Sequence, residues 1–253
     1  MKIGIIADIH SNINALNVVL NKFDKIKIDK IICCGDVIGI GPNPEETIQA
    51  LIKRKDILLA VRGNHEQYLL KGLPKKIHDD KREMNLGEIK NHEWTHSKLS
   101  ENSKNFISQF KISNIIEIEG KKIYINHYPS NENGIYKKHI KKLTIKQNEE
   151  MFSGIDADIF IYGHTHTTSI NNKNFYCHRL CNNKNNKWYI NSGSLGCPVK
   201  SNIANAGILE INKNEICYRQ LKIEYNVNEV IQEIERLKFP FYKGILKIFY
   251  GKE

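Results

Sequence analysis

The chain has 253 residues, a formal net charge of +10 and a pI of about 9.2. Hydrophobic residues make up 40% and charged residues 26%, which excludes an unstructured polyelectrolyte and leaves enough apolar residues for a sizeable core. No apolar run approaches the roughly 20 residues needed to cross a bilayer, and no signal-peptide pattern is present, so we expect a cytoplasmic protein without a membrane partner.

The first 65 residues alternate between strand and helix patterns. The spacing of apolar residues predicts strands over 2–7, 31–34 and 57–61, a helix capped by Ser11 or Asn12, and a helix over 44–52. A Gly-rich turn over 35–41 follows the second strand. This order favours parallel strands joined by right-handed crossovers.

The rest of the chain has a helical part followed by a strand-rich part. Residues 68–110 have a helical pattern, and we expect them to form an insertion or cap within one domain that covers residues 1–253. Strands are predicted over 115–118, 122–126, 159–162, 188–191, 207–211 and 215–221. Turns are expected over 119–121 and 212–214, and a final helix over 227–237. No stretch is long enough to be a linker between domains.

Five apolar strands are each followed directly by Asp, Asn or His side chains. These residues are Asp8 and His10, Asp36, Asn64 and His65, His127, and His164 and His166. Ligands of open α/β sheets gather at the carboxyl ends of the strands. Carboxylate, amide oxygen and neutral imidazole suit Mn²⁺, Fe²⁺, Ni²⁺, Co²⁺ and Zn²⁺. The pattern predicts a site for two such ions, in which Asp36 can bridge because both of its oxygens are able to bind.

These strand-end residues resemble the calcineurin-like metallophosphoesterase superfamily, and more closely its small bacterial and archaeal phosphodiesterase-like branch. The GNHE string at 63–66 and the segments 39–44, 94–95 and 191–198 support the resemblance, which covers nearly the whole chain. It implies a two-sheet αββα sandwich. It also implies a hydrolase in which metal-bound hydroxide attacks a phosphodiester or phosphomonoester.

The resemblance also implies a role for each site residue. The first metal would be held by Asp8, His10, Asp36 and His166, and the second by Asp36, Asn64, His127 and His164. His65 would be catalytic, either stabilising charge in the transition state or protonating the leaving oxygen. Mn²⁺ is the ion we expect, and Ni²⁺, Fe²⁺, Co²⁺ or Zn²⁺ remain alternatives. The positive net charge fits a phosphorylated small molecule, a nucleotide or a nucleic acid as substrate.

Three positions depart from the pattern of the superfamily; one of them is Val199-Lys200, where the branch commonly has Arg-Asp. Members that act on phosphoproteins usually carry an Asp three residues after the bridging Asp, where it orients the catalytic His, and this chain has Gly39 there. Tyr128 follows His127 where the branch usually has Gly, which could narrow the pocket. We expect residues 68–110 and the 128–136 loop to wall the substrate groove.

Two other functions remain open from the sequence. His92-Glu93-Trp94-Thr95-His96 matches the HExxH pattern of zinc proteases, although no third ligand follows it. If the motif binds no metal, we expect it to be part of an insertion helix in which Trp94 packs inward and the histidines face solvent. The second alternative is a non-catalytic scaffold or binding subunit of the same fold, although such proteins tend to lose metal ligands.

Overall fold

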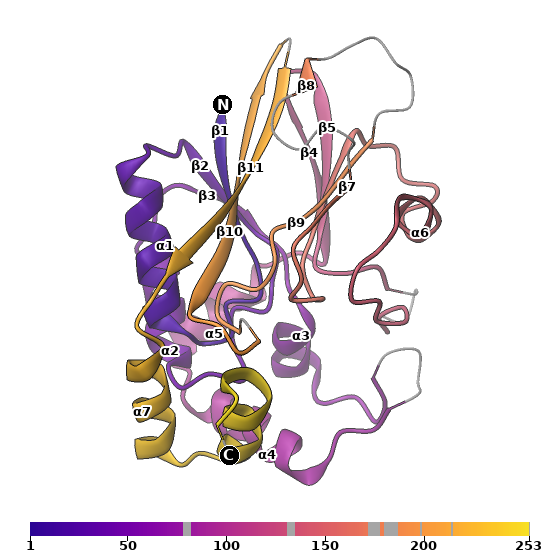
Figure 1. Ribbon diagram of the computed structural model, residues 1–253. Helices are drawn as coiled ribbons and strands as arrows, with labels where there is room; N and C mark the ends of the chain where they lie inside the picture. Colours follow the sequence, from indigo (N-terminus) through magenta and orange to yellow (C-terminus); the bar gives the residue numbers. More distant parts are fainter. Residues whose placement is uncertain are drawn as a thin grey trace.

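Two mixed sheets lie face to face in this protein (Figure 1). The structure is a computed structural model that describes residues 1–77, 82–130, 135–171, 178–179, 187–197, 199–213 and 215–252. The sheets are flanked by helices on their outer faces, which confirms the expected two-sheet αββα sandwich.

The first sheet has the strand order β3-β2-β1-β10-β11-β8. Its strands are β1 (Lys2–Ile6), β2 (Lys30–Cys33), β3 (Ile57–Ala60), β8 (His178–Arg179), β10 (Ile203–Asn212) and β11 (Glu215–Glu224). β1, β2 and β3 are parallel, as predicted from the alternation of strands and helices. β10 pairs antiparallel with β1 and with β11.

The second sheet has the order β4-β5-β6-β9-β7. Its strands are β4 (Ser113–Ile118), β5 (Lys121–Asn126), β6 (Ile159–Tyr162), β7 (Ser169–Asn171) and β9 (Trp188–Asn191). β4 and β5 form the predicted hairpin, and both residues of its turn, Glu119 and Gly120, have positive φ. β5, β6 and β9 are parallel, so their carboxyl ends lie at one edge of the sheet.

Helices cover the outer face of each sheet. α1 (Ile13–Lys25) and α2 (Pro44–Ile52) lie against the first sheet, and α6 (Ile145–Met151) lies beside the second sheet (Figure 1). Asn12 caps α1 by accepting a hydrogen bond from the Ala15 amide at 3.0 Å. One apolar core fills the space between the sheets and two others lie beneath the helices, so each element buries its apolar face.

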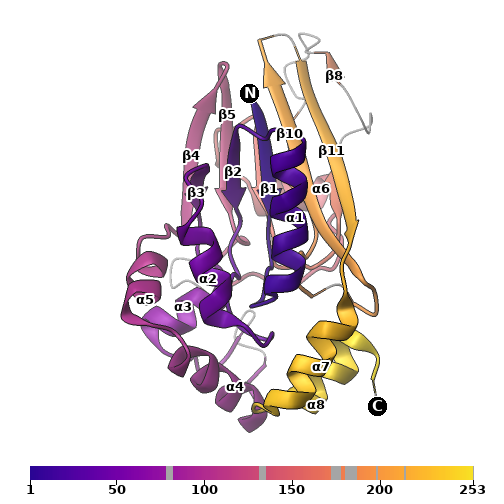
Figure 2. The same ribbon diagram turned by 90° about the vertical axis from the view of Figure 1, so that its left-hand side faces the viewer.

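The remaining helices gather at the end of the molecule where the parallel strands finish (Figure 2). They are α3 (Asn64–Lys71), α4 (Leu86–Ser97), α5 (Glu101–Ser108), α7 (Val227–Leu237), α8 (Tyr242–Ile245) and the π-helical turn η1 (Leu246–Tyr250). The mainly helical character expected for 68–110 is confirmed for its described part, although 72–77 and 82–85 are not helical and α3 already begins at Asn64. Asn64 and His65 therefore lie on the first turn of a helix.

Most predicted elements are found within a few residues of their expected bounds, but several short ones were not predicted. α6, β7, β8, α8 and η1 have no counterpart among the expected elements. The expected turn over 212–214 lies partly outside the described residues, because residue 214 is not among them. In the part of the chain that the structure describes, every helix is too short or too polar to span a membrane. The cytoplasmic location stays a prediction.

Candidate metal centre

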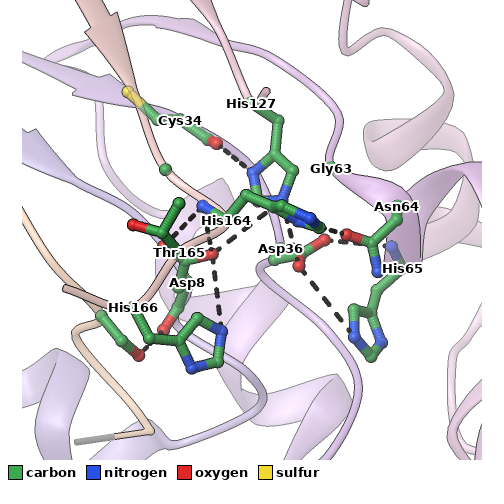
Figure 3. Close-up of polar contacts among 12 residues, drawn as sticks. Asp8, Cys34, Asp36, Gly63, Asn64, His65, His127, His164, Thr165 and His166 are labelled. Carbon is green, nitrogen blue, oxygen red and sulfur yellow. Dashed lines mark hydrogen bonds and ion pairs between the residues drawn. The ribbon is translucent and has the colours of Figure 1, made fainter. Parts of the chain in front are cut away.

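The polar side chains predicted to share a site do converge. Asp8 and His10 follow β1, Asp36 follows β2, and Asn64 begins α3. His127 follows β5, while His164 and His166 follow β6. The labelled side chains among them point toward a common centre (Figure 3), and His10 joins them with its Nε2 2.9 Å from His166 Nε2. The structure brings together all seven predicted ligands and His65.

The first group of donor atoms comprises Asp8, His10 and His166. Their ligand atoms all lie within 4.8 Å of one another. The Nε2 atoms of His10 and His166 are 2.9 Å apart, and His166 Nε2 is 3.8 Å from Asp8 Oδ1. Two imidazole nitrogens at this distance need a proton or a cation between them, because two lone pairs would otherwise face each other.

The second group comprises Asp36, His127 and His164, with Asn64 beside them. His127 Nε2 is 3.2 Å from Asp36 Oδ2 and 3.2 Å from His164 Nδ1. His164 Nδ1 is in turn 3.0 Å from Asn64 Oδ1. Asp36 also lies in a group with His10 and His65, since its Oδ2 is 3.9 Å from His10 Nε2. Asp36 is therefore the carboxylate between the two groups of ligands.

The two ring nitrogens of His127 face different partners, a backbone carbonyl and the Asp36 carboxylate. Its Nδ1 donates a hydrogen bond to the Cys34 carbonyl at 2.7 Å, and a carbonyl can only accept, so Nδ1 carries the proton. Nε2 faces Asp36 Oδ2 at 3.2 Å, and once the ring is neutral it is the nitrogen with the lone pair that a cation would bind. Such a carbonyl contact commonly fixes the tautomer of an imidazole that ligates a metal.

The electrostatics of the site suit divalent cations. Asp8 and Asp36 are only 0% and 2% exposed, and within the described ranges no lysine or arginine pairs with either. Burial raises the pKa of Asp8 to about 7, with a contribution from the charge of Asp36. Two buried carboxylates in one site that no lysine or arginine neutralises are costly, and divalent metal ions compensate such a pair. The donor set therefore fits the cations expected from the sequence.

The imidazoles respond to this environment in opposite directions. Burial and neighbouring imidazoles hold the pKa of His10 well below its usual value, and burial lowers that of His166 to about 4. Burial acts the same way on His127, but the Asp36 carboxylate outweighs it and raises the pKa to about 9. At neutral pH His10 and His166 are thus ready to bind a cation, whereas His127 must first lose a proton.

Five of the seven predicted ligands have a strained backbone. Positive φ angles between 46° and 69° are found at Asp8, His10, Asp36, His164 and His166. Non-glycine residues in this region cost about 1–3 kcal/mol each, and such strain concentrates at functional sites. The loops are held there by hydrogen bonds between them, including His10 N to Asp36 O at 2.9 Å.

Glu66 supports the turn that carries Asp36, a role that sequence reasoning missed. Its fully buried carboxylate accepts hydrogen bonds from the amides of Asp36, Val37 and Gly63 at 2.9, 2.8 and 2.7 Å, and from Ile38 at 3.2 Å. The sequence did contain a signal for this role. A glutamate at the third position of a helix can form a capping box, and Glu66 does so with the Gly63 amide.

The 191–196 string supports the other loops. Asn191 Nδ2 donates to Gly163 O at 2.8 Å, which fixes the start of the turn that carries His164. Ser194 Oγ donates to Asp8 O at 2.8 Å. These polar residues, which supported the family resemblance, position the backbone of the ligand loops and do not face the centre themselves.

His65 lies beside the ligands with its Nε2 toward them. Nε2 is 4.0 Å from Asp36 Oδ2, and the His65 amide donates to Asp36 Oδ1 at 3.0 Å. Gly39 approaches the opposite side of the ring so closely that a Cβ there would lie 1.9 Å from Nδ1. The missing Asp therefore leaves no gap, because the ring of His65 occupies the space where a side chain at position 39 would begin.

The HExxH segment does not form a zinc-protease site in the described structure. His92 and His96 lie on α4 with ring centroids 6.1 Å apart, and among the described residues neither joins a group of three metal-binding side chains. Trp94 packs inward as expected, stacked on Phe239 at 4.5 Å. The expectation that the histidines face solvent is wrong for His92, which is only 6% exposed, because α4 folds back onto α3.

A cavity of about 530 Å³ opens onto the centre. Its floor includes His10, Asp36 and His166, and its walls come from 68–110 and from the C-terminal helices. The apolar and aromatic wall residues are Ile40, Tyr68, Ile77, Met84, Val199, Phe241, Ile245, Ile248 and Phe249. The insertion thus does wall the site, as expected. Residues 131–134 of the 128–136 loop lie outside the described residues. In the described part, the Tyr128 ring packs on the His164 ring with 4.8 Å between the ring centroids.

Comparison with known proteins identifies a matching family and a relative of similar length. Residues 1–214 match the family model described as the calcineurin-like phosphoesterase superfamily domain. The uncharacterized protein MJ0912 of Methanocaldococcus jannaschii is 27% identical over 261 residues, covering 99% of this chain and 98% of that protein.

Two solved structures have similar folds. A metallophosphoesterase from Sphaerobacter thermophilus has a TM-score of 0.72 at 20% identity, covering 98% of both chains. The hypothetical protein PH1004 from Pyrococcus horikoshii OT3 has a TM-score of 0.74 at 18% identity, covering 100% of this chain and 99% of that one. At these identities the likeness establishes the fold.

Proposed function

This chain belongs to the calcineurin-like phosphoesterase superfamily, and we propose that it is a phosphoesterase that works with two divalent cations. Asp8, His10, Asp36 and His166 would hold one ion, and Asp36, Asn64, His127 and His164 the other. The observation that carries the proposal is the place of Asp36, whose Oδ2 lies within 3.2–4.0 Å of a histidine from each group and of His65.

The ions would neutralise charge on the phosphoryl oxygens and lower the pKa of water enough to supply a nucleophile near neutral pH. Mn²⁺ is the ion we propose, and Ni²⁺, Fe²⁺, Co²⁺ or Zn²⁺ also suit these ligands. The chain's own contribution is to fix the ligands on strained, hydrogen-bonded loops and to place His65 Nε2 on the cavity side of Asp36. From there Nε2 would donate a hydrogen bond or proton to an oxygen of the substrate.

The shape of the cavity favours a small phosphoester as substrate. Its volume of about 530 Å³ falls in the range of small-molecule sites. Apolar side chains on the walls suit an organic group, while Lys141 in the lining offers a positive charge; the Arg82 guanidinium in the lining is paired with Glu88 at 3.0 Å. We therefore propose a phosphorylated small molecule or nucleotide in preference to a nucleic-acid duplex.

Hydrolysis of a nitrophenyl phosphodiester and a nitrophenyl phosphomonoester tests the proposal. Protein supplied with Mn²⁺ should cleave at least one of them, and Asp36→Ala should lower kcat at least 1,000-fold, roughly the loss expected when charge stabilisation at the reacting centre is removed. Asp24→Ala is the matched control, because Asp24 only pairs with Arg54 on the surface.

Full activity in Asp36→Ala would contradict the proposal. Tight metal binding without turnover of any phosphoester, under any of the five metals, would instead favour the non-catalytic scaffold.

A further inference from the structure

The turn after Asp36 has no side chain at position 39 that could hold the ring of His65. Gly39 stands at that position, with φ of +88°, and a Cβ there would lie 1.9 Å from His65 Nδ1. His65 Nδ1 is buried and has no hydrogen-bond partner among the described residues. The ring must therefore be held by packing; Tyr68 on the same helix lies 6.0 Å away between ring centroids, and a closer ring comes from another element.

The helical insertion supplies a ring at this place. His92 of α4 packs on His65 with 4.8 Å between the ring centroids and 45° between the ring planes. Tyr68 lies edge-on to His92 at 5.1 Å and so limits the movement of His92 in turn. His65 also touches His10, but that ring belongs to the proposed ligand set.

The surroundings of His92 indicate a reason for its burial other than metal binding. It is 6% exposed and its Nδ1 has no partner within the described chain, so no hydrogen bond of that atom accounts for the position of the ring. His92 and His65 line the same cavity above the metal ligands. Burial, reinforced by His65 and His96, lowers the pKa of His92 to about 2, which keeps the ring neutral.

We propose that His92 is a positioning residue, whose ring packs against His65 and holds it in the orientation in which Nε2 faces the substrate. This inference rests on the proposed phosphoesterase function. It assigns the HExxH segment to the same site, because one of its histidines acts through His65. The segment then needs no metal ion of its own. The contact is one of packing between two rings tilted at 45° to each other, so another planar ring should replace it.

The test compares kcat and KM for His92→Ala and His92→Phe on a nitrophenyl ester and on an unactivated phenyl ester. His92→Ala should lower kcat roughly 10- to 100-fold with little change in KM, because misplacement of a catalytic group by about 1 Å has effects of this order. His92→Phe should stay within about threefold of wild type. His96→Ala is the control, since His96 lies one turn further along α4 and does not line the cavity.

A double variant separates positioning from a general loss of structure. If His92 acts through His65, then His65→Ala and His65→Ala/His92→Ala should have the same kcat on each ester. Additive losses, an unchanged kcat in His92→Ala, or a His92→Phe as slow as His92→Ala would each overturn the inference. The metal content of each variant, measured by mass spectrometry, should equal that of wild type. If wild type cleaves no ester, the proposed function fails instead.

Discussion

The two carboxylates of the site are held by the backbone and face imidazoles. Asp8 accepts hydrogen bonds from the His164 amide at 2.9 and 3.0 Å, and Asp36 accepts one from the His65 amide. Each carboxylate thereby ties together two loops from distant parts of the chain. Such contacts fix the oxygens before any cation arrives, which is the condition for a preorganised site.

Binding of cations should release protons, because two of the ligands are protonated without them. The pKa values of about 7 for Asp8 and about 9 for His127 lie above their ordinary values, so both groups hold protons that a cation must displace. Mn²⁺ affinity should therefore rise as pH increases from 6.5 to 8.5, by up to tenfold per unit for each proton released, and level off above about 9. Titration calorimetry in buffers of different ionisation enthalpy measures the protons released. An affinity that stays constant over this range would contradict the assignment of these ligands.

Replacing Glu66 by Gln should weaken both folding and metal binding. An amide group offers one oxygen in place of two, and its NH₂ would face the amides of Asp36 and Gly63. Each buried donor left without a partner costs about 1–3 kcal/mol, so we expect a loss of about 3 kcal/mol in unfolding free energy. Urea unfolding and Mn²⁺ titration measure the two effects.

Glu101→Gln is the control for this change, because Glu101 is an exposed partner of Lys104 and such pairs contribute under about 1 kcal/mol. A Glu66→Gln protein as stable as wild type would show that the carboxylate does not hold the Asp36 turn.

At the scale of the elements, the turn after β2 is shaped to admit His65. Gly39→Ala should abolish turnover while the protein still folds and binds metal, because the new Cβ would displace the His65 ring. Gly120→Ala is the matched control. Gly120 also has positive φ, at +73°, but nothing lies within 4 Å of its Cβ position, so this variant should lose only about 1–2 kcal/mol of stability through strain. Activity in Gly39→Ala equal to that of the control would contradict the tight fit of His65.

Elements with a strong local pattern could be predicted from the sequence, and others could not. α7 has a regular apolar face and β6 an unbroken apolar run, and both were predicted at their observed bounds. β7 covers only three residues, and α6 has only one buried position, so neither carries a periodic signal. The burial of His92 was also not predicted. Which side of α4 faces inward depends on how the insertion folds back onto α3, and no local pattern encodes this.

At the scale of the whole molecule, the convergence of the site depends on pairings that no local pattern encodes. β1 pairs with β10, about 200 residues further along the chain, as Lys2 opposite Glu210 shows. The residues that gather at the site could be predicted because ligands of α/β sheets bind at the carboxyl ends of the strands. This prediction requires only that the parallel strands end at the same edge. The supporting residues, such as Glu66 and Asn191, act across loops whose mutual positions the sequence does not reveal.

Anomalous X-ray diffraction from crystals grown with Mn²⁺ tests the central claim most directly. We expect two peaks about 3.5–4 Å apart, the usual spacing of such pairs, with Asp36 between them. One peak should lie beside Asp8, His10 and His166, and the other beside Asn64, His127 and His164. The absence of any peak within bonding distance of Asp36, or a single ion bound elsewhere, would contradict the account.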